Sequence, residues 1–397
     1  MDYNTLGLEV TPPEQGCVFD AGSLYAQLAQ LGDKRRARGK RYRLEQVLLW
    51  MILAKLSGED QPSGIAEWVR LRAAPLREAL AVSRPSLPCH NTYRRVLGEA
   101  VDVAELQAVV SQFLTQPAAA GRSVLIAIDG KTLRGSIPRG QTRGIHLLAA
   151  YLPAEGIVLM QVAVDSKENE ISAAPKVLKT LDLRGKIVMG DALLTQRDVS
   201  AQILQAQGDY VWLVKDNQPQ LRQDIEQVFA PEVCVPGFSP TPKDFQTART
   251  VDKGHGRFEA RILTTSSVLR DYADWPGLEQ VFKLERRIVN LKEGTFRDEV
   301  VYGVTSLRAA EASPAQLLAI VRGYWGIENG LHYRRDRTLR EDATRMTRAT
   351  LAEGMAILNN LVVGLALQQG WPYLPAARRH YNARLSDALN LVLRGTG

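Results

Sequence analysis

The hydrophobic residues in the first third of the chain recur with the spacing of α-helices. Leu44, Val47, Leu48 and Met51 fall on one side of a helix, and a second helical pattern begins at Ile65 after a Pro-Ser-Gly break. No strong strand pattern occurs in this part of the chain. Residues 1–118 are therefore predicted to form a helical N-terminal domain.

From residue 123 the pattern changes to short continuous apolar runs, which are typical of buried strands. The first run, residues 123–128, ends at Asp129 and Gly130, and a later run ends at Asp191. Between these two lie a pair of runs around a Pro-Ala-Glu turn, which predicts antiparallel strands. The predicted strands and helices after the first run cover residues 145–152, 156–164, 171–181, 186–190, 196–206 and 210–214.

This order of elements predicts an α/β fold, a ribonuclease H-like mixed sheet flanked by helices. In that topology the first and fourth strands are neighbours, so Asp129 and Asp191 are expected to lie side by side. A proline-rich stretch and three strand patterns then predict a mostly β insertion. The predicted parts after the N-terminal domain are a catalytic core at 119–216 and 311–370, the insertion at 217–310, with strands at 257–264, 280–289 and 298–305, and an outer helical tail at 371–397.

Charge and cysteine content narrow the functional classes. The chain has 50 Lys plus Arg against 43 Asp plus Glu, a net charge of +7 that favours an acidic partner such as nucleic acid. The three cysteines, Cys17, Cys89 and Cys234, fit neither a disulfide framework nor a zinc site. The first residues contain no basic stretch followed by an apolar core, and the longest apolar run, residues 355–367, is interrupted by two asparagines, so neither a signal peptide nor a membrane span is predicted. A cytoplasmic, nucleoid-associated protein is expected.

Two basic segments of the helical region are candidate DNA contacts. Residues 34–43 form the densest basic run, and it can be either a solvated loop or an arm that contacts phosphates. Asn91 is a candidate N-cap for a helix that contains Arg94 and Arg95. That helix can be a recognition helix or one with an exposed arginine face, and the sequence leaves both open.

Candidate catalytic chemistry centres on three carboxylates. Cutting and joining DNA needs compensation for charge on the attacking and leaving oxygens, and two magnesium ions held by carboxylates supply it. Asp129 and Asp191 taken singly are more often turn or cap residues, but their matching positions on neighbouring strands favour a metal site. Glu328 is the candidate third acid, because Trp325, Glu328, His332 and Arg335 are predicted to share one helix face.

Three further acids follow Glu328 in the sequence. Asp336 is predicted to support the site through a neighbouring residue, whereas Glu341 and Asp342 are expected to begin or cap the next helix. A phosphate-binding loop is excluded at Gly130-Lys131-Thr132, since the upstream glycine that such a loop requires would stand at Leu125.

Several short motifs carry a resemblance to a known family. The chain resembles bacterial insertion-sequence DDE transposases of the H-repeat-associated (ISAs-type) group over nearly its whole length. The segments that carry this resemblance are residues 128–135, 167–171, 190–192, 215–218, 255–257 and 325–329.

The resemblance implies a ribonuclease H-like core, cleavage at inverted-repeat ends and joining to target DNA. Around the glutamate the wider superfamily has a tyrosine, an arginine and a lysine, where this chain has Val321, Tyr324 and Arg335. Arg322 is expected to replace the arginine, and Arg335 the lysine.

The predicted function is therefore a metal-dependent transposase with Asp129, Asp191 and Glu328 as catalytic residues and metal ligands. Its cofactor is expected to be two Mg²⁺ ions, with Mn²⁺ as a substitute, and its partner double-stranded DNA bound by a homodimer. The alternatives are a domesticated DNA-binding protein without catalysis and a nuclease without strand transfer. The candidate DNA contacts are Lys131, Arg134, Lys215, Arg322, Trp325, His332, Arg335, Arg35, Arg36, Arg38, Lys40 and Arg41.

Overall fold

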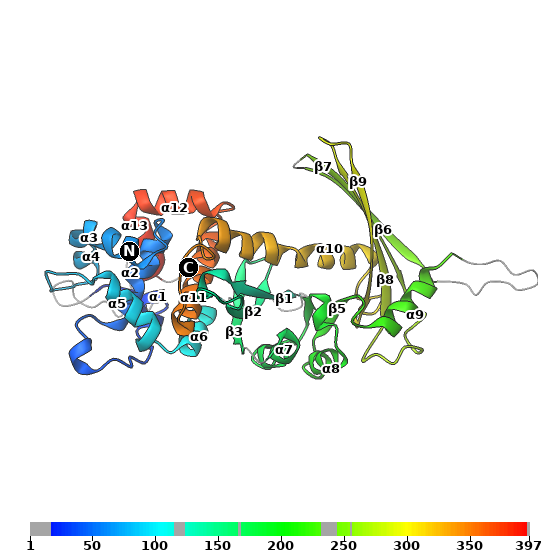
Figure 1. The fold of residues 1–397 in the computed structure, drawn as a ribbon, viewed down its shortest axis with the longest axis horizontal. Coiled ribbons are helices and arrows are strands. Elements are labelled where there is room, and N and C mark those ends of the chain that lie inside the picture. Colours follow the sequence, from blue (N-terminus) through cyan, green and yellow to red (C-terminus); the bar gives the residue numbers. More distant parts are fainter. Residues whose placement is uncertain (1–16, 115–123, 166–167, 232–243, 255, 395–397) are drawn as a thin grey trace, which may run out of the picture.

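The computed structural model describes residues 17–114, 124–165, 168–231, 244–254 and 256–394. The predicted domain limits at residues 118 and 119, and most of the proline-rich stretch, lie outside these ranges. The molecule is elongated, with helices at one end, a sheet in the middle and long strands at the other end (Figure 1).

The helical end contains segments from both ends of the chain. Helix α2 lies at its centre, and all its residues are buried, which explains its continuous apolar sequence. The N-terminal helices are α1 (Leu24–Leu28), α2 (Leu44–Leu56), α3 (Pro62–Leu71), α4 (Ala73–Ala79), α5 (His90–Arg95) and α6 (Val103–Leu114). The C-terminal helices are α11 (Ala349–Gln368), α12 (Leu374–Ala383) and α13 (Leu385–Leu393).

The segment predicted as an outer helical tail forms α12 and α13, which belong to this helical end. Helices α12 and α13 pack against α1, α2 and α11. Arg378 of α12 is buried and its Nη2 lies 2.8 Å from Asp60 Oδ1, so this cation is paired inside the protein. Helix α11 is also long and apolar enough to cross a membrane, but 83% of its apolar window is buried within the protein.

In the described residues, a mixed sheet of nine strands forms the rest of the core, in the order β3-β2-β1-β4-β5-β9-β8-β7-β6. Strands β1 and β4 run parallel, as do β4 and β5, whereas β2 and β3 are antiparallel to their neighbours. The strands are β1 (Val124–Leu133), β2 (Ile145–Leu152), β3 (Ile157–Val164), β4 (Lys186–Gly190), β5 (Asp209–Val214), β6 (Gln246–Gly254), β7 (Arg257–Ser266), β8 (Gln280–Asn290) and β9 (Phe296–Thr305).

Helices cover both faces of this sheet. Helices α7 (Glu170–Leu178) and α8 (Arg197–Gln205) lie on one face, and α10 (Pro314–Tyr324) crosses the other (Figure 1). Helix α9 (Pro219–Phe229) packs against β8 and β9. The α/β class with a large mixed sheet is confirmed, and so is the prediction that the first and fourth strands are neighbours.

Three elements differ from the sequence prediction. Strand β1 does not end at Asp129 but continues to Leu133, because its pairing with β2 extends beyond its pairing with β4. Strand β6 was not predicted, since its sequence is polar and most of its residues are exposed at the sheet edge. Helix α5 is preceded by Cys89 at the N-cap position, so Asn91 lies inside the helix and does not cap it.

Candidate active site

The parallel pairing of β1 with β4 places Asp129 and Asp191 side by side. Its last pair is Ile128 with Gly190, and one aspartate follows each of these residues. Asp129 remains in β1, opposite Ala149 of β2. Asp191 leaves β4 and accepts a hydrogen bond from the backbone N of Ala192 at 2.5 Å. The two side chains therefore start from adjacent positions at the carboxyl ends of the paired segments of β1 and β4.

Glu328 approaches the same place from the end of α10. That helix ends at Tyr324, and Glu328 is an exposed residue in the π-helical turn Ile327–His332. Tyr324 donates a long hydrogen bond from Oη to Oδ1 of Asp129 at 3.5 Å. His332 Nε2 lies 3.7 Å from Oδ2 of Asp129. The segment that carries Glu328 thus lies against β1 at Asp129.

Burial and the charges of neighbouring carboxylates alter the pKa of Asp129. Burial, followed by the negative charges of Glu328 and Glu170, raises the pKa of Asp129 to about 7, and Asp191 adds to this effect. Burial and the nearby Arg335 and Lys131 lower the pKa of His332 to about 3, so its imidazole is neutral at pH 7. Since neither Tyr324 nor His332 is charged, these contacts do not compensate the negative charge around Asp129.

Glu170 and His146 are site residues that sequence reasoning did not select. Glu170 opens α7, and its Oε1 lies 2.7 Å from Nε2 of His146 on β2. The other ring nitrogen of His146 lies 2.9 Å from Oγ1 of Thr132 on β1. A Cβ at Gly130 would meet Glu170 Oε1 at 2.0 Å and His146 Nε2 at 2.5 Å, so this glycine leaves the space that the pair fills. The available signal was the motif at residues 167–171, which contains Glu170.

The donor chemistry of the site fits a divalent cation. Carboxylate oxygens are hard ligands, and the negative charges of Glu328, Glu170 and Asp191 around Asp129 favour a cation there. Among the described residues, however, no three His, Cys, Asp or Glu side chains are close enough together to hold a metal ion. The site therefore has the ligand types for a metal, in positions that do not enclose one.

Two predicted DNA contacts, Arg335 and Lys131, are held in internal ion pairs. Arg335 has 1% of its side chain exposed, and its Nε donates to Oε2 of Glu341 at 2.9 Å. Lys131 has 8% of its side chain exposed and donates to Asp336. The expected phosphate contacts from these residues do not fit their positions, because each cation already has a buried or partly buried carboxylate partner.

The predicted shared helix face is also wrong. Helix α10 stops at Tyr324, and the π-helical turns that follow have a wider spacing than an α-helix. As a result Trp325 and Glu328 are exposed, whereas His332 and Arg335 are buried. His332 therefore faces Asp129 rather than a solvent surface where DNA could bind.

Glu341 and Asp342, two of the acids beyond Glu328, have other roles than predicted. Glu341 is buried against Arg335 and accepts a hydrogen bond from Nδ2 of Asn359 at 2.7 Å. Asp342 accepts one from the backbone N of Arg134 at 3.1 Å. Neither caps a helix, because α11 begins only at Ala349.

Four other candidate contacts lie around the site with solvent-exposed side chains. Lys215 Nζ lies 3.7 Å from Asp191 Oδ1 and has 61% of its side chain exposed. Arg134 is exposed next to Asp342, and Arg322 lies 3.0 Å from Asp252 of β6. The ring of Trp325 has the guanidinium of Arg286 5.6 Å from its centre. These side chains can reach an approaching ligand, although each has a neighbour within the protein.

The basic loop, residues 34–43, contains cations that are bound within the protein and cations that are exposed. Arg35 is bound by Asp33 and by the carbonyl of Tyr42, so most of its hydrogen-bonding capacity is used internally. Lys40 lies 3.9 Å from the same aspartate. The other cations of this loop, Lys34, Arg36, Arg38, Arg41 and Arg43, have exposed side chains, and two of them, Lys34 and Arg43, pair with Asp102 and Glu45.

Comparisons with known proteins identify the family of this chain. Residues 120–365 match the family described as Transposase DDE domain, and residues 25–114 match the one described as DDE_Tnp_1-associated. Putative transposase YncI of Escherichia coli is 28% identical over 86% of this chain and 87% of its own length. H repeat-associated putative transposase YhhI of Escherichia coli is 27% identical over 94% and 98%. A piggyBac transposase synaptic complex with hairpin DNA aligns with 92% of this chain and 78% of its own, at 11% identity and a TM-score of 0.45.

The family match covers more than half of the chain and includes all three carboxylates. The protein is therefore a DNA transposase of the DDE class, an enzyme that cleaves DNA and depends on divalent metal ions. The chain belongs to the Transposase DDE domain family, and the resemblance to H-repeat-associated transposases is confirmed.

Proposed function

We propose that Asp129, Asp191 and Glu328 are the catalytic carboxylates of this transposase, and that they hold two Mg²⁺ ions, with Mn²⁺ as a substitute. The observation that carries the proposal is the register of β1 and β4, which puts one aspartate directly after each member of the Ile128–Gly190 pair. The contacts of Tyr324 and His332 with Asp129 support Glu328 as the third acid, since both lie within four residues of it.

Bound metal ions would supply an activated oxygen nucleophile and stabilise the charge on the leaving oxygen. The protein's own residues orient this chemistry. Asp129 needs to lose its proton before it can bind a cation, and the surrounding Glu170 and Glu328 favour cation binding for the same reason that they raise its pKa. The neutral phenol of Tyr324 can donate to Asp129 without adding charge.

The proposal also includes the fold of the core, the DNA substrate and the oligomeric state. We infer that strands β1 to β5 form a ribonuclease H-like core, which their order and directions support, and that β6 to β9 are an insertion before the segment with the third acid. The enzyme would act on double-stranded DNA, cutting at inverted-repeat ends and joining the free 3′-hydroxyl to a target. Lys215 and Arg134 are suited to contact phosphates near the carboxylates because both are exposed. Synapsis of two ends implies a homodimer on DNA, in the cytoplasm and on the nucleoid.

The test is cleavage of a supercoiled plasmid that carries the element's own ends, with Mg²⁺, by the intact protein and by Asp191→Ala and Glu328→Ala. Both variants are expected to bind the ends and to lose cleavage. The exposed acid Asp271 provides a matched control, and Asp271→Ala should cut as the intact protein does. Equal cutting by all four proteins would contradict the assignment of the site.

The same reaction separates the other functions. Cleaved ends without strand-transfer products would identify a nuclease that hydrolyses DNA but does not join it. Binding of the ends by all proteins, with no cutting by any of them, would identify a DNA-binding protein without catalysis. Joined products from the intact protein alone would support the complete transposase reaction.

A further inference from the structure

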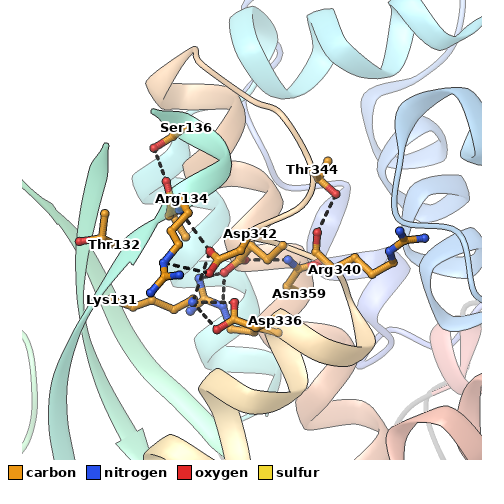
Figure 2. Close-up of polar contacts among 12 residues, drawn as sticks. Lys131, Thr132, Arg134, Ser136, Asp336, Arg340, Asp342, Thr344 and Asn359 are labelled. Atoms are coloured by element: carbon orange, nitrogen blue, oxygen red, sulfur yellow. Dashed lines mark hydrogen bonds and ion pairs between the residues drawn. The ribbon is translucent and has the colours of Figure 1, made fainter. Parts of the chain in front are cut away.

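Lys131 lies two residues beyond Asp129 on β1, and because side chains alternate along a strand, the two side chains share one face of the sheet. The Nζ of Lys131 donates to both carboxylate oxygens of Asp336, at 2.6 and 2.8 Å (Figure 2). With 8% of the Lys131 side chain exposed, its charge is directed to the inside of the protein.

A second carboxylate completes this cluster. Asp342 Oδ1 lies 3.6 Å from Lys131 Nζ, and the same oxygen accepts a hydrogen bond from the backbone N of Arg134 (Figure 2). Arg134 directly follows β1, whereas Asp336 and Asp342 lie between α10 and α11. The cluster therefore joins the end of β1 to the chain segment that follows Glu328.

The segment with Glu328 needs such external support. It consists of two π-helical turns, Ile327–His332 and Arg334–Thr338, and π-helical turns are uncommon and short in proteins. Before Glu328 the segment is attached to β1 by the 3.5 Å hydrogen bond from Tyr324 to Asp129. After Glu328 it is attached by the ion pair of Asp336 with Lys131, which has much shorter contacts.

We propose that Lys131 and Asp336 are positioning residues of the transposase reaction. Resting on the proposed function of the carboxylates, this assignment means that the ion pair holds the Glu328 segment at a set distance from Asp129 and so fixes the separation of two metal-binding groups. It also replaces the predicted DNA contact of Lys131, since a phosphate would have to displace both oxygens of Asp336.

The test measures binding of Mn²⁺ alone to the full chain without DNA, from the electron paramagnetic resonance signal of the free ion. Lys131→Met keeps the apolar stem of the side chain, and Asp336→Asn keeps its shape, but both remove the ion pair. Each is expected to weaken Mn²⁺ binding by about tenfold or more, as residues that support metal ligands usually do. The double variant should be no weaker than the worse single variant, because both substitutions break the same contact.

A matched ion pair far from the site controls for a general loss of stability. His380 Nε2 lies 2.9 Å from Asp387 Oδ2 in the helical end, and Asp387 has 38% of its side chain exposed against 32% for Asp336. Asp387→Asn should leave Mn²⁺ binding unchanged. Lys131→Arg keeps the positive charge and should retain most of the affinity, which also keeps the test usable if Lys131→Met does not fold.

Hydrogen exchange provides a second measure that does not depend on the metal. The amides of residues 327–338 should exchange faster in Asp336→Asn than in the intact protein or in Asp387→Asn. Unchanged Mn²⁺ affinity and unchanged exchange in Asp336→Asn would overturn the positioning role. If Asp129→Asn and Asp191→Asn also bind Mn²⁺ like the intact protein, the carboxylate site itself is wrong, and the two failures are thus distinguishable.

Discussion

Arg335 and Glu341 form an ion pair inside the protein, with Nε to Oε2 at 2.9 Å and 1% and 2% of the two side chains exposed. Gln161 of β3 also accepts a hydrogen bond from this guanidinium, at 3.3 Å. The pair therefore joins the segment after Glu328 to the edge of the sheet.

Removal of either partner should destabilise the fold without changing DNA contacts. Glu341→Ala is expected to lower the free energy of unfolding by about 3–5 kcal/mol, because it leaves a buried charge without a partner. Arg335→Ala should cost a similar amount, and the double variant less than the sum. Urea unfolding measures these values. If Arg335→Ala instead keeps full stability and weakens end binding in a salt-dependent way, the arginine contacts phosphate after all.

The exposed arginines of the basic loop should contribute to DNA affinity. Substitution of Arg36, Arg38 and Arg41 by Ala is expected to reduce the slope of log K against log salt by up to about three, since each phosphate contact contributes about 0.9. Arg35→Ala is the matched control, because Asp33 already holds that side chain. Binding to the ends at several salt concentrations measures the slope. A slope that none of these substitutions changes would support the solvated-loop interpretation.

Asp129 should make the stability of the metal-free protein depend on pH. Its pKa is raised to about 7 from the ordinary value of 3.8, so between these values the folded protein holds a proton that the unfolded chain releases. The contribution of Asp129 to the free energy of unfolding is then fully present below pH 4 and is lost as the pH rises through 7. Asp129→Asn mimics the protonated form and should match the intact protein at pH 4 but exceed it at pH 8 by about 2–4 kcal/mol.

Urea unfolding in the presence of a chelator, at both pH values, measures this difference. Asp271→Asn, a substitution of an exposed acid, should show no comparable change between pH 4 and pH 8. A constant difference between Asp129→Asn and the intact protein at the two pH values would mean that Asp129 keeps an ordinary pKa.

The proton on Asp129 should compete with a metal ion for the carboxylate. Because Asp129 has to ionise before it binds a cation, the affinity of the intact protein for Mn²⁺ is expected to rise between pH 6 and pH 8, with protons released on binding. Calorimetry in buffers of different ionisation enthalpy counts those protons. Metal binding without proton release at pH 6 would exclude Asp129 as a protonated ligand.

Gly130 should tolerate no side chain. An added Cβ would overlap Glu170 Oε1 and the ring of His146, so Gly130→Ala is expected to displace this pair and to cost about 1–3 kcal/mol of stability. Gly254 is also a strand glycine but has nothing within 4 Å of its Cβ position, and Gly254→Ala should be nearly neutral. Thermal unfolding compares the two variants. Equal effects would show that the His146–Glu170 pair does not require the glycine.

The sequence predicted the parts of the fold that depend on local pattern. Continuous apolar runs located β1 to β5, and the position of each aspartate after its run placed Asp129 and Asp191 together, since neighbouring parallel strands end at one sheet edge. Strand β6 was missed because an exposed edge strand needs no apolar face, and its polar residues follow neither strand pattern.

The contacts that decide the roles of basic residues could not be predicted in this way. Lys131 and Asp336 are 205 residues apart in sequence, and Arg335 and Gln161 are 174 apart. A basic residue beside a candidate site suggests a phosphate contact unless its partner is known, and these partners come from distant segments. The end of α10 could not be predicted from the sequence either, and the change to π-helical turns there altered which side chains face solvent.

The pairing of β5 with β9 makes the insertion part of the architecture of the core. Val211 to Val214 are paired with Thr305 to Tyr302, so β9 covers the edge that β5 would otherwise expose. Excision of residues 217–310 would leave the backbone groups of a buried apolar strand open to pairing with other molecules, and aggregation would be expected. Among the described residues, the insertion is joined to the core sheet by this pairing of β5 with β9. A ligand that bends β7 or β8 would also distort the strands next to the carboxylates, because a continuous ladder of hydrogen bonds connects them.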